Sequence, residues 1–464
     1  METLGVLEEF VAALMDRAAR GLGPEETAET HRTLLNVVGT SVGAIRSREA
    51  DALVAVGQQL GGSELRVPGR NDLLDRYYVA TLIGFAAHFD DFDDTHLATV
   101  IHPGAATLGA WYVQGNLEPV APETALMAFA MGVESQLRVG LAMTPSHYDD
   151  GWHITGTCGV IGAAVAAGLM MGLDQAQLAA AIGIAAEMTL GHREAFGTPI
   201  KPFHAGKAAS NGLFAAALAR AGLRTGGDCF AGEPSYFTAL AHDHDVAILG
   251  APSIAGRLVL LDNTYKPFPC GIVAHPAIEA AVNLHGRFGD DVDAIDEVLV
   301  TCNPLVPELM GRATATTGLE ARFCAIHGVS VGLLYGRGGL AEFSDEKAVD
   351  ARVVKLRGKT KLMPDSSCPR DAATVTVVWM DGRSEVSEVL QAAGSLERPL
   401  SDEALLSKFT SLVEPVLPGA SGALAASALA VGATTGPTDL GAVIGDATSR
   451  GGAASLSDAR GARA

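Results

Sequence analysis

The chain has 464 residues, a formal net charge of −20 and 48% hydrophobic residues, with only 5% aromatic residues. This length exceeds one ordinary hydrophobic core, so we expect two or three domains, and the apolar content excludes a disordered chain. The strong negative charge argues against nucleic acid and anionic membranes as partners. It also repels anionic substrates, so a site for one must gather lysine, arginine and histidine locally.

The six cysteines are scattered, without a CxxC pair or histidines at zinc-finger spacing. We therefore expect reduced thiols and a cytoplasmic protein. The N-terminus reads as an amphipathic helix and lacks the basic region and cleavage site of a signal peptide. Residues 156–173 are long and uncharged enough for a membrane span, but they are rich in Gly and Ala and lack basic or aromatic flanks. We interpret them as a buried helix.

A helical pattern runs from the start of the chain to about Arg257. Apolar residues recur three and four positions apart, as in TALMAFAMGVESQLRVGL and AQLAAAIGIAAEM, with short Gly- and Pro-bearing links between the segments. The small side chains favour closely packed helices. Residues 1–262 are therefore predicted to form the first part of a large all-helical domain.

The pattern changes after RLVLLDNTYKPFPCG. One more helix is followed by β-branched runs at 298–302, 351–356 and 373–380, the last of which ends in an Asp-Gly turn. We predict strands there and a smaller α+β domain over residues 263–396. Helical periodicity returns in SDEALLSKFTSLVEPVL, so residues 397–464 are predicted to rejoin the helical domain, with a frayed tail. The expected fold class is mainly α.

The first candidate motif, HFDDFDDTH, begins at His88 and is followed by His102-Pro-Gly. Four aspartates within five positions cannot all lie on one solvated face, so a cation, a ligand or a raised pKa must compensate for their packing. The alternative is an acidic loop that caps a helix, with Asp94 or Thr95 as the N-cap.

The second motif, GWHITGT, places His153 and hydroxyl side chains directly before the Ala- and Gly-rich helix. Backbone N–H groups and the positive end of the helix dipole make such a terminus an anion site. The alternative is a histidine with a purely structural hydrogen bond.

The third motif, GTPIKPFHAGK, holds Lys201 between two prolines. Proline restricts its own backbone and that of the preceding residue, so we predict a rigid turn without regular helix. A poorly solvated lysine there would serve as a catalytic cation. The alternative is an exposed loop lysine.

The fourth motif, YKPFPCG with His275 beyond it, lies at the predicted domain junction, where ligand clefts are common. No sequence neighbour lowers the pKa of Cys270, so we interpret it as a small cleft residue. GVSVG at 328–332 fits G-x-S-x-G but lies in a helical run, and His242-Asp-His-Asp reads as a solvated loop. No nucleotide-binding glycine motif occurs.

In this order, the motifs resemble the MmgE/PrpD family, which includes 2-methylcitrate dehydratase, cis-aconitate decarboxylase and iminodisuccinate epimerase. The resemblance rests on DFDDTH with a following HPG, GWHITGTCGVIGAAVAAGLMMGLD, GTPIKPFHAGKAASNGLFAAALA, YKPFPCGIVAHPAIEAA and RFCAIHGVSVGLLYG. These span about 88–340, and the terminal helices agree in character. The resemblance implies an all-helical domain with a smaller α+β lid, a homodimer, and an active site without a metal or an organic cofactor.

The resemblance also implies site residues, carried over one position at a time from the matching motifs. A lid histidine of the decarboxylase members falls on Gly271 here, and their lid tyrosine falls on His327, which weakens a transfer of decarboxylase activity. The implied catalytic residues are His153, Lys201, His102 and Asp91, and the implied substrate-binding residues are Thr95, Lys266 and His327.

Dehydration of a β-hydroxy acid needs a base, an acid and cations for the carboxylates. We assign His153 as the leading acid or base, Lys201 as the cation, and His102 with Asp91 as a second acid-base pair in which Asp91 tunes the histidine. Lys266 closes over the substrate with the lid. We expect a cofactor-independent lyase for a small polycarboxylic acid, most directly a dehydratase of the 2-methylcitrate dehydratase type, with an epimerase or a decarboxylase as family alternatives.

Two hypotheses from other classes of protein remain. DDFDD fits the DDxxD pattern of metal-dependent terpene cyclases, but those sites need a second metal motif and an aromatic-lined cavity, and the sequence offers neither. A non-catalytic helical binding protein predicts a cleft without convergent cations and leaves the stiffened turn at Lys201 unexplained.

Overall fold

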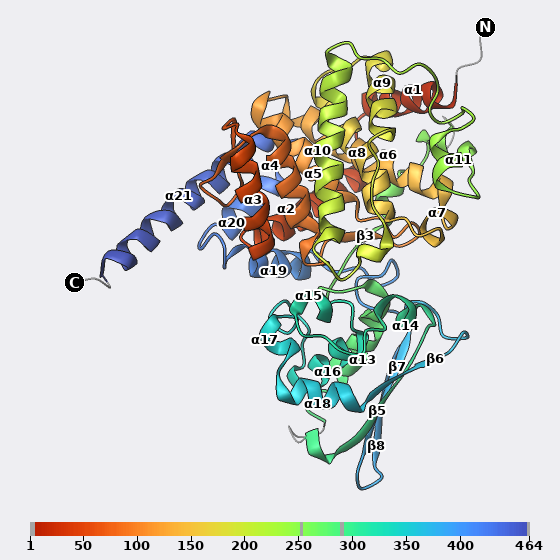
Figure 1. Ribbon diagram of the computed structural model, residues 1–464, viewed down its shortest axis with the longest axis vertical. Coiled ribbons are helices and arrows are strands. Elements are labelled where there is room, and N and C mark those ends of the chain that lie inside the picture. Colours follow the sequence, from red (N-terminus) through yellow and green to blue (C-terminus); the bar gives the residue numbers. More distant parts are fainter. Residues whose placement is uncertain (1–4, 251–253, 288–291, 462–464) are drawn as a thin grey trace.

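The computed structural model describes residues 5–250, 254–287 and 292–461, with side chains as far as residue 450. Within these residues the chain is mainly α-helical, with two two-stranded sheets and one four-stranded sheet (Figure 1). Two hydrophobic clusters organise it. We call the residues around the first cluster the helical part and those around the second the mixed part.

The helical part combines helices from both ends of the chain. Helices α19 (Asp402–Val413) and α20 (Ser421–Leu429) pack on α2, and α21 (Pro437–Gly461) packs on α5. The preceding helices are α1 (Val6–Ala19), α2 (Pro24–Ala44), α3 (Arg48–Leu60), α4 (Arg76–Phe89), α5 (Pro103–Leu117), α6 (Pro122–Met143), α7 (Ser146–Asp149), α8 (Ile154–Met170), α9 (Gln175–Ala186), α10 (Ile200–Arg220) and α11 (Tyr236–Leu240), with short 3-10 turns at Arg193–Ala195, Val246–Leu249 and Val259–Asp262.

Small residues bring the central helices close together. A methyl group at Gly212 of α10 would lie 2.6 Å from the carbonyl oxygen of Val160 in α8, so glycine is required at this crossing. Helix α8 is the apolar segment that we interpreted as a buried helix, and nearly all of it is buried among α5, α6, α9 and α10. Among the described residues, no helix has the length and apolar character needed to span a membrane.

The mixed part is built on a four-stranded sheet in the order β6-β5-β7-β8. Strands β5 and β6 run parallel, whereas the other pairs are antiparallel. Alternate residues of β7 are buried, because one face of the sheet carries the helices of this part (Figure 1). Its elements are α13 (His275–Leu284), β5 (Ile295–Cys302), α14 (Leu305–Met310), α15 (Gly318–Ala321), α16 (Ala325–Tyr335), α17 (Asp345–Ala348), α18 (Ala351–Lys359), β6 (Thr360–Pro364), β7 (Ala373–Trp379) and β8 (Ser384–Val389), with 3-10 turns at Ile272–Ala274 and Val292–Ala294.

One local prediction was wrong. Residues 351–356 form helix α18 instead of a strand, because Asp350 caps the helix by accepting hydrogen bonds from the backbone N–H groups of Arg352 and Val353. Helix α21 extends to Gly461, and the expected fraying of the tail stays a prediction. The strands at 298–302 and 373–380 are observed within β5 and β7, and the Asp-Gly turn joins β7 to β8.

A small sheet between the two parts positions the candidate site. Strand β3 (Asp94–His96) pairs antiparallel with β4 (Asn263–Tyr265), which sets the acidic motif beside the YKPFPCG motif. In sequence, the first hydrophobic cluster extends to Tyr265 and resumes at Leu405, and the second extends from Cys270 to Val389. The domain boundaries near residues 263 and 396 remain predictions.

Candidate active site

All four aspartates of the acidic motif are buried between α4 and β3. A buried carboxylate is costly unless it is paired, hydrogen-bonded or protonated. Asp90 accepts a hydrogen bond from Arg322 (2.7 Å). Asp94 accepts from the Gly104 N–H (3.1 Å) and from Asn263 (2.8 Å), and burial raises its pKa to about 7. Neither Asp94 nor Thr95 is the N-cap residue of α5, which is His102, although Asp94 accepts a hydrogen bond from the first turn of that helix at Gly104.

Asp91 is compensated by two lysines. Its Oδ1 forms ion pairs with the Nζ atoms of Lys201 and Lys266, the latter at 3.1 Å, and its carbonyl oxygen accepts a hydrogen bond from Lys266 (3.0 Å). Burial alone would raise the pKa of Asp91, but the two ammonium groups hold it well below its usual range. Asp91 contacts the lysines, and a ligand atom of His102 lies within 4.8 Å of its carboxylate, so the suggested tuning of His102 by Asp91 stays a prediction.

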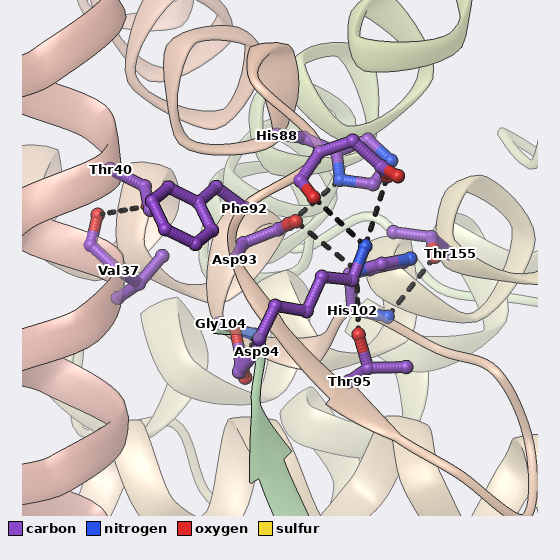
Figure 2. A network of polar contacts seen from close by, with 12 residues as sticks. Val37, Thr40, His88, Phe92, Asp93, Asp94, Thr95, His102, Gly104 and Thr155 are labelled. Carbon is purple, nitrogen blue, oxygen red and sulfur yellow. Dashed lines mark hydrogen bonds and ion pairs between the residues drawn. The ribbon is translucent and has the colours of Figure 1, made fainter. Parts of the chain in front are cut away.

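Asp93 is the carboxylate that contacts His102. Its Oδ1 lies 3.2 Å from Nδ1 of His102, and its Oδ2 lies 2.7 Å from Nδ1 of His88 (Figure 2). Burial works against ionisation, yet the two imidazoles hold the pKa of Asp93 well below its usual range. An ionised carboxylate only accepts hydrogen bonds, so His88 carries a hydrogen on Nδ1 and a lone pair on Nε2. Nδ1 of His102 also lies 3.2 Å from the hydroxyl oxygen of Thr95, and the nearby carboxylate of Asp93 favours the same tautomer for His102. Burial lowers the pKa of His102, which favours its neutral form.

His153 forms a second imidazole pair with His204. His153 is the N-cap residue of α8, and its Nδ1 lies 3.0 Å from Nδ1 of His204 in α10. Its ring stacks on that of His88, with centroids 5.5 Å apart. Burial lowers the pKa of His153 well below its usual value and that of His204 to about 4. Both rings are therefore neutral near pH 7, and one of the two Nδ1 atoms donates to the other.

Lys201 lies in the first turn of α10, which begins at Ile200. The prediction that the flanking prolines exclude regular helix was wrong. Pro199 is the N-cap residue and Pro202 is the third helical residue, and proline is tolerated there because N–H groups of the first turn have no partner within the helix. Burial lowers the pKa of Lys201, although Asp91 acts in the opposite direction.

One cleft gathers six of the seven predicted site residues and has about 570 Å³ of empty space, its open mouth included. Among the described non-glycine residues, positive φ angles occur at Asp91 (50°) and Val100 (55°), and both line this cleft. Such strained backbone is concentrated at functional sites. The six residues are Asp91, Thr95, His102, His153, Lys201 and Lys266.

His327 is not among the residues that line this cleft. It lies on α16 inside the mixed part, fully buried, with Nε2 2.9 Å from the carbonyl oxygen of Glu342 and its ring against Phe343. Its surroundings suit a core histidine, and its suggested role in substrate binding stays a prediction.

Sequence reasoning missed Lys408, a buried residue of α19. Its ammonium group donates to Oδ1 of Asn36 (2.8 Å) and to the carbonyl oxygens of Phe92 (2.6 Å) and Lys266 (2.9 Å). Burial lowers its pKa to about 7. Lys408 thus ties the acidic motif to the segment that carries Lys266. The sequence could have indicated this residue, because Lys408 lies four positions before Leu412, on the apolar face of an amphipathic helix.

Asp93, His88 and His204 were also missed as site residues, although all three lie inside the motifs quoted from the sequence. Periodicity shows which residues share a face of a regular element. It does not show which aspartate of an irregular segment meets a histidine from the next helix.

The donor set also permits a test for a metal ion. His88, Asp91, Asp93 and His102 each offer a ligand atom within 4.8 Å of one another. However, Oδ1 of Asp91 already pairs with two ammonium groups, and the two oxygens of Asp93 lie against the imidazoles of His102 and His88. A divalent cation would have to displace these donors and lie beside two positive charges, so the arrangement fits a metal poorly.

Comparisons with known proteins agree with this architecture. The MmgE/PrpD N-terminal domain matches residues 8–249 and the MmgE/PrpD C-terminal domain matches residues 268–429. Cis-aconitate decarboxylase of Mus musculus is 27% identical over 371 residues, covering 75% of this chain and 74% of that protein, and that of Homo sapiens is 28% identical over 358 residues, 73% of each. The 2-methylcitrate dehydratase of Cupriavidus necator is 28% identical over 362 residues, 70% of this chain and 72% of that protein.

Proposed function

The chain belongs to the MmgE/PrpD family, and we propose that it is a cofactor-independent lyase that dehydrates a small polycarboxylic acid. The observation that carries the proposal is the convergence of His102, His153, Lys201 and Lys266 on one cleft. These side chains supply the proton-transfer groups and the cations that loss of water from a β-hydroxy acid requires.

His102 is the proposed base. Asp93 holds its Nδ1–H, so the lone pair on Nε2 is free to accept a proton from the substrate. When the imidazolium forms, Asp93 lies 3.2 Å away and stabilises it. Removal of a proton next to a carboxylate places negative charge on that carboxylate. Lys201 and Lys266 lie where this charge develops, against the single carboxylate of Asp91.

His153 is the proposed acid. A neutral imidazole donates from one nitrogen, and its partner determines which one. When His204 carries the hydrogen between the two Nδ1 atoms, His153 carries its own hydrogen on Nε2 and can donate it to the departing hydroxyl. Among the described residues, Nε2 of His153 has no hydrogen-bond partner, which leaves it available to a substrate.

Decarboxylation is the second candidate, because two of the relatives are cis-aconitate decarboxylases. Decarboxylation and epimerisation need the same stabilisation of an enolate-like charge by lysines. The terpene-cyclase reading has little support, since all four aspartates are engaged by lysine, arginine, histidine or backbone donors. A non-catalytic binding protein does not account for the paired lysines in the cleft.

We also propose that the mixed part closes over the cleft as a lid and that the chain forms a homodimer, as the family resemblance implies. Light scattering after size-exclusion chromatography would report a mass near twice the 47.7 kDa of one chain if the dimer forms.

A proton NMR screen of di- and tricarboxylic acids with the purified protein tests the proposed reaction. Dehydration produces a new olefinic signal, decarboxylation a product with one fewer carboxylate, and epimerisation a diastereomer of unchanged mass. We expect the olefinic product. Conversion to a decarboxylated product alone would transfer the assignment to the second candidate.

A further inference from the structure

The two sides of the cleft differ in chemistry. The helical part and Lys266 contribute its ionisable side chains. The residues that the mixed part contributes beyond Pro267 carry no polar side chain. We call them the apolar wall: Gly271, Ile272, Val273, Leu309, Met310 and Phe323.

Met310 fills the space beside Gly271 in this wall. A Cβ atom at Gly271 would overlap the sulfur of Met310, and Met310 is only 1% exposed. At this point the wall is therefore a packed surface of hydrocarbon and thioether groups.

Two arginines near the wall are paired elsewhere, and Arg370 belongs to an adjoining cleft that Ile272, Val273 and Leu309 also line. Arg312 pairs with Glu320 (3.2 Å), and Arg322 pairs with Asp90 (2.7 Å). Neither side chain lines the cleft. Among the described residues that do line it, the cations are the lysines at 201 and 266.

The charges on the polar side balance one substrate carboxylate. Two ammonium groups lie against the single carboxylate of Asp91, and the neighbouring histidines are neutral near pH 7. Lys201, Lys266 and Asp91 together carry one positive unit, which suits one carboxylate, and the ionised Asp93 beside His102 leaves no positive charge for a second one. A further carboxylate held against the apolar wall would lose its water without gaining a cation or a hydrogen bond, which is strongly unfavourable.

We propose that the substrate is a hydroxy dicarboxylic acid with an uncharged alkyl substituent on the carbon that faces the apolar wall. This inference rests on the proposed function and narrows its substrate class. One carboxylate lies between Lys201 and Lys266, the alkyl group packs on Val273, Leu309 and Met310, and the second carboxylate stays in contact with water at the open side of the cleft. Tricarboxylic acids fit this arrangement poorly.

A matched series of acids tests the proposal. Malate, 2-methylmalate, 2-ethylmalate and citrate share one skeleton and carry hydrogen, methyl, ethyl and carboxymethyl on the same carbon. Dissociation constants are measured by titration calorimetry at one pH and ionic strength. We expect affinity to rise about fourfold with each added carbon, as for burial of a CH₂ group. We expect citrate to bind at least about tenfold more weakly than 2-ethylmalate. Citrate binding as tightly as 2-ethylmalate, or more tightly, would overturn the proposal.

A pair of variants assigns the effect to the wall. Val273 is half-buried, so both Val273→Lys and its uncharged control Val273→Met should fold. Lysine offers a carboxylate a partner at the wall, and we expect the affinity ratio of citrate to 2-ethylmalate to rise at least about fivefold, as for a partly exposed ion pair. The methionine variant should keep the wild-type ratio within about twofold. Equal ratios in the two variants would show that the substituent does not contact the wall.

The same samples separate failure of this inference from failure of the proposed function. Preferred binding and dehydration of citrate would leave the lyase proposal standing and refute the substrate class. If citrate or another acid of the NMR screen reacts but neither alkylmalate binds, only the substrate class is wrong. If none of these acids and no acid of the screen binds or exchanges a proton with solvent, the lyase proposal is wrong as well.

Discussion

Replacing Asp93 by Asn removes the carboxylate that orients His102 while keeping the shape of the side chain. In the wild type, Oδ2 accepts a hydrogen bond from Nδ1 of His88 at 2.7 Å, and Oδ1 lies 3.2 Å from Nδ1 of His102. An asparagine offers one oxygen and one NH₂ group, so it cannot favour a hydrogen on Nδ1 of both histidines. The shorter contact favours His88 as the ring that keeps its hydrogen on Nδ1. His102 then keeps Thr95 as its hydrogen-bond partner but loses the carboxylate that favours a hydrogen on Nδ1, and the tautomer without a lone pair on Nε2 gains population.

The expected loss follows from the role of the base. A positioned acid or base contributes about 10²–10⁴-fold, and a histidine held in the wrong tautomer loses most of that contribution. We therefore expect Asp93→Asn to lower kcat/KM by about 10²–10⁴-fold, measured by the initial rate of product formation. Circular dichroism and a thermal melt establish that the variant is folded.

Asp94→Asn is the matched control. Asp94 is also buried, but it accepts from Gly104 and Asn263 and contacts no histidine, and its pKa of about 7 means that it is partly protonated at neutral pH. Its replacement should change kcat/KM by less than about tenfold. A folded Asp93→Asn variant with near-wild-type turnover, or two variants with equal losses, would refute the assignment of Asp93 and His102.

The pH profile gives the same assignment a second readout. Burial lowers the pKa of His102 below its ordinary value of 6.5, so the neutral base persists to lower pH than a free histidine would. The acid limb of kcat/KM should lie below pH 6.5. Asp93 acts to raise this pKa, so the limb should move to still lower pH in Asp93→Asn. A limb that moves to higher pH would contradict the sign of this argument.

Further predictions concern the acid, the cations and the metal. His153→Ala should lower kcat by roughly 10²-fold or more. Lys201→Ala should lose about 3–4 kcal/mol of transition-state stabilisation, measured through kcat/KM. Near-full turnover in both folded variants would contradict the assignment of these two residues to the active site. Lys408→Met should change kcat and KM, because it displaces the backbone of Lys266. The control Lys359→Met loses hydrogen bonds to the carbonyl oxygens of Val292 and Ile295, away from the cleft, and should lower only the melting temperature. Equal kinetics in the two variants would mean that Lys408 has only a structural role. Activity should survive exhaustive EDTA treatment, and a loss restored by Mg²⁺ would revive the metal-dependent reading.

The sequence predicted the elements whose side chains repeat regularly. The helices of the first 250 residues and the alternating strand at 373–380 follow from apolar spacing, because that spacing reports which face is buried. The helix at 351–356 was missed because β-branched residues suggested a strand, whereas the cap at Asp350 starts a helix. The prolines around Lys201 led to the wrong prediction of a turn without helix. Proline is unfavourable inside a helix but acceptable in its first turn, where Lys201 lies.

The sequence identified the motifs that form the site, but it did not show which side chains within them contact one another. Asp91 and Asp93 are two positions apart, yet one meets lysines and the other histidines. Asp91 has a left-handed backbone, so the segment does not follow the simple alternation of an extended strand. Lys408 comes from a helix more than 300 residues away along the chain from Phe92. Such a contact depends on the tertiary packing of α19 on α2, which no local pattern encodes.

Solvent exchange measured by proton NMR tests most directly whether this site removes a proton next to a carboxylate without a metal. The EDTA-treated wild-type protein and the folded Asp93→Asn variant are incubated in D₂O with 2-methylmalate and 2-ethylmalate, and the signal of the protons next to the carboxylate is followed. We expect the wild type to cause loss of that signal or formation of an olefinic product. We expect either process to be about 10²-fold slower or more in the variant. Unchanged spectra with these and the other acids of the screen, or equal rates in the two proteins, would contradict this expectation.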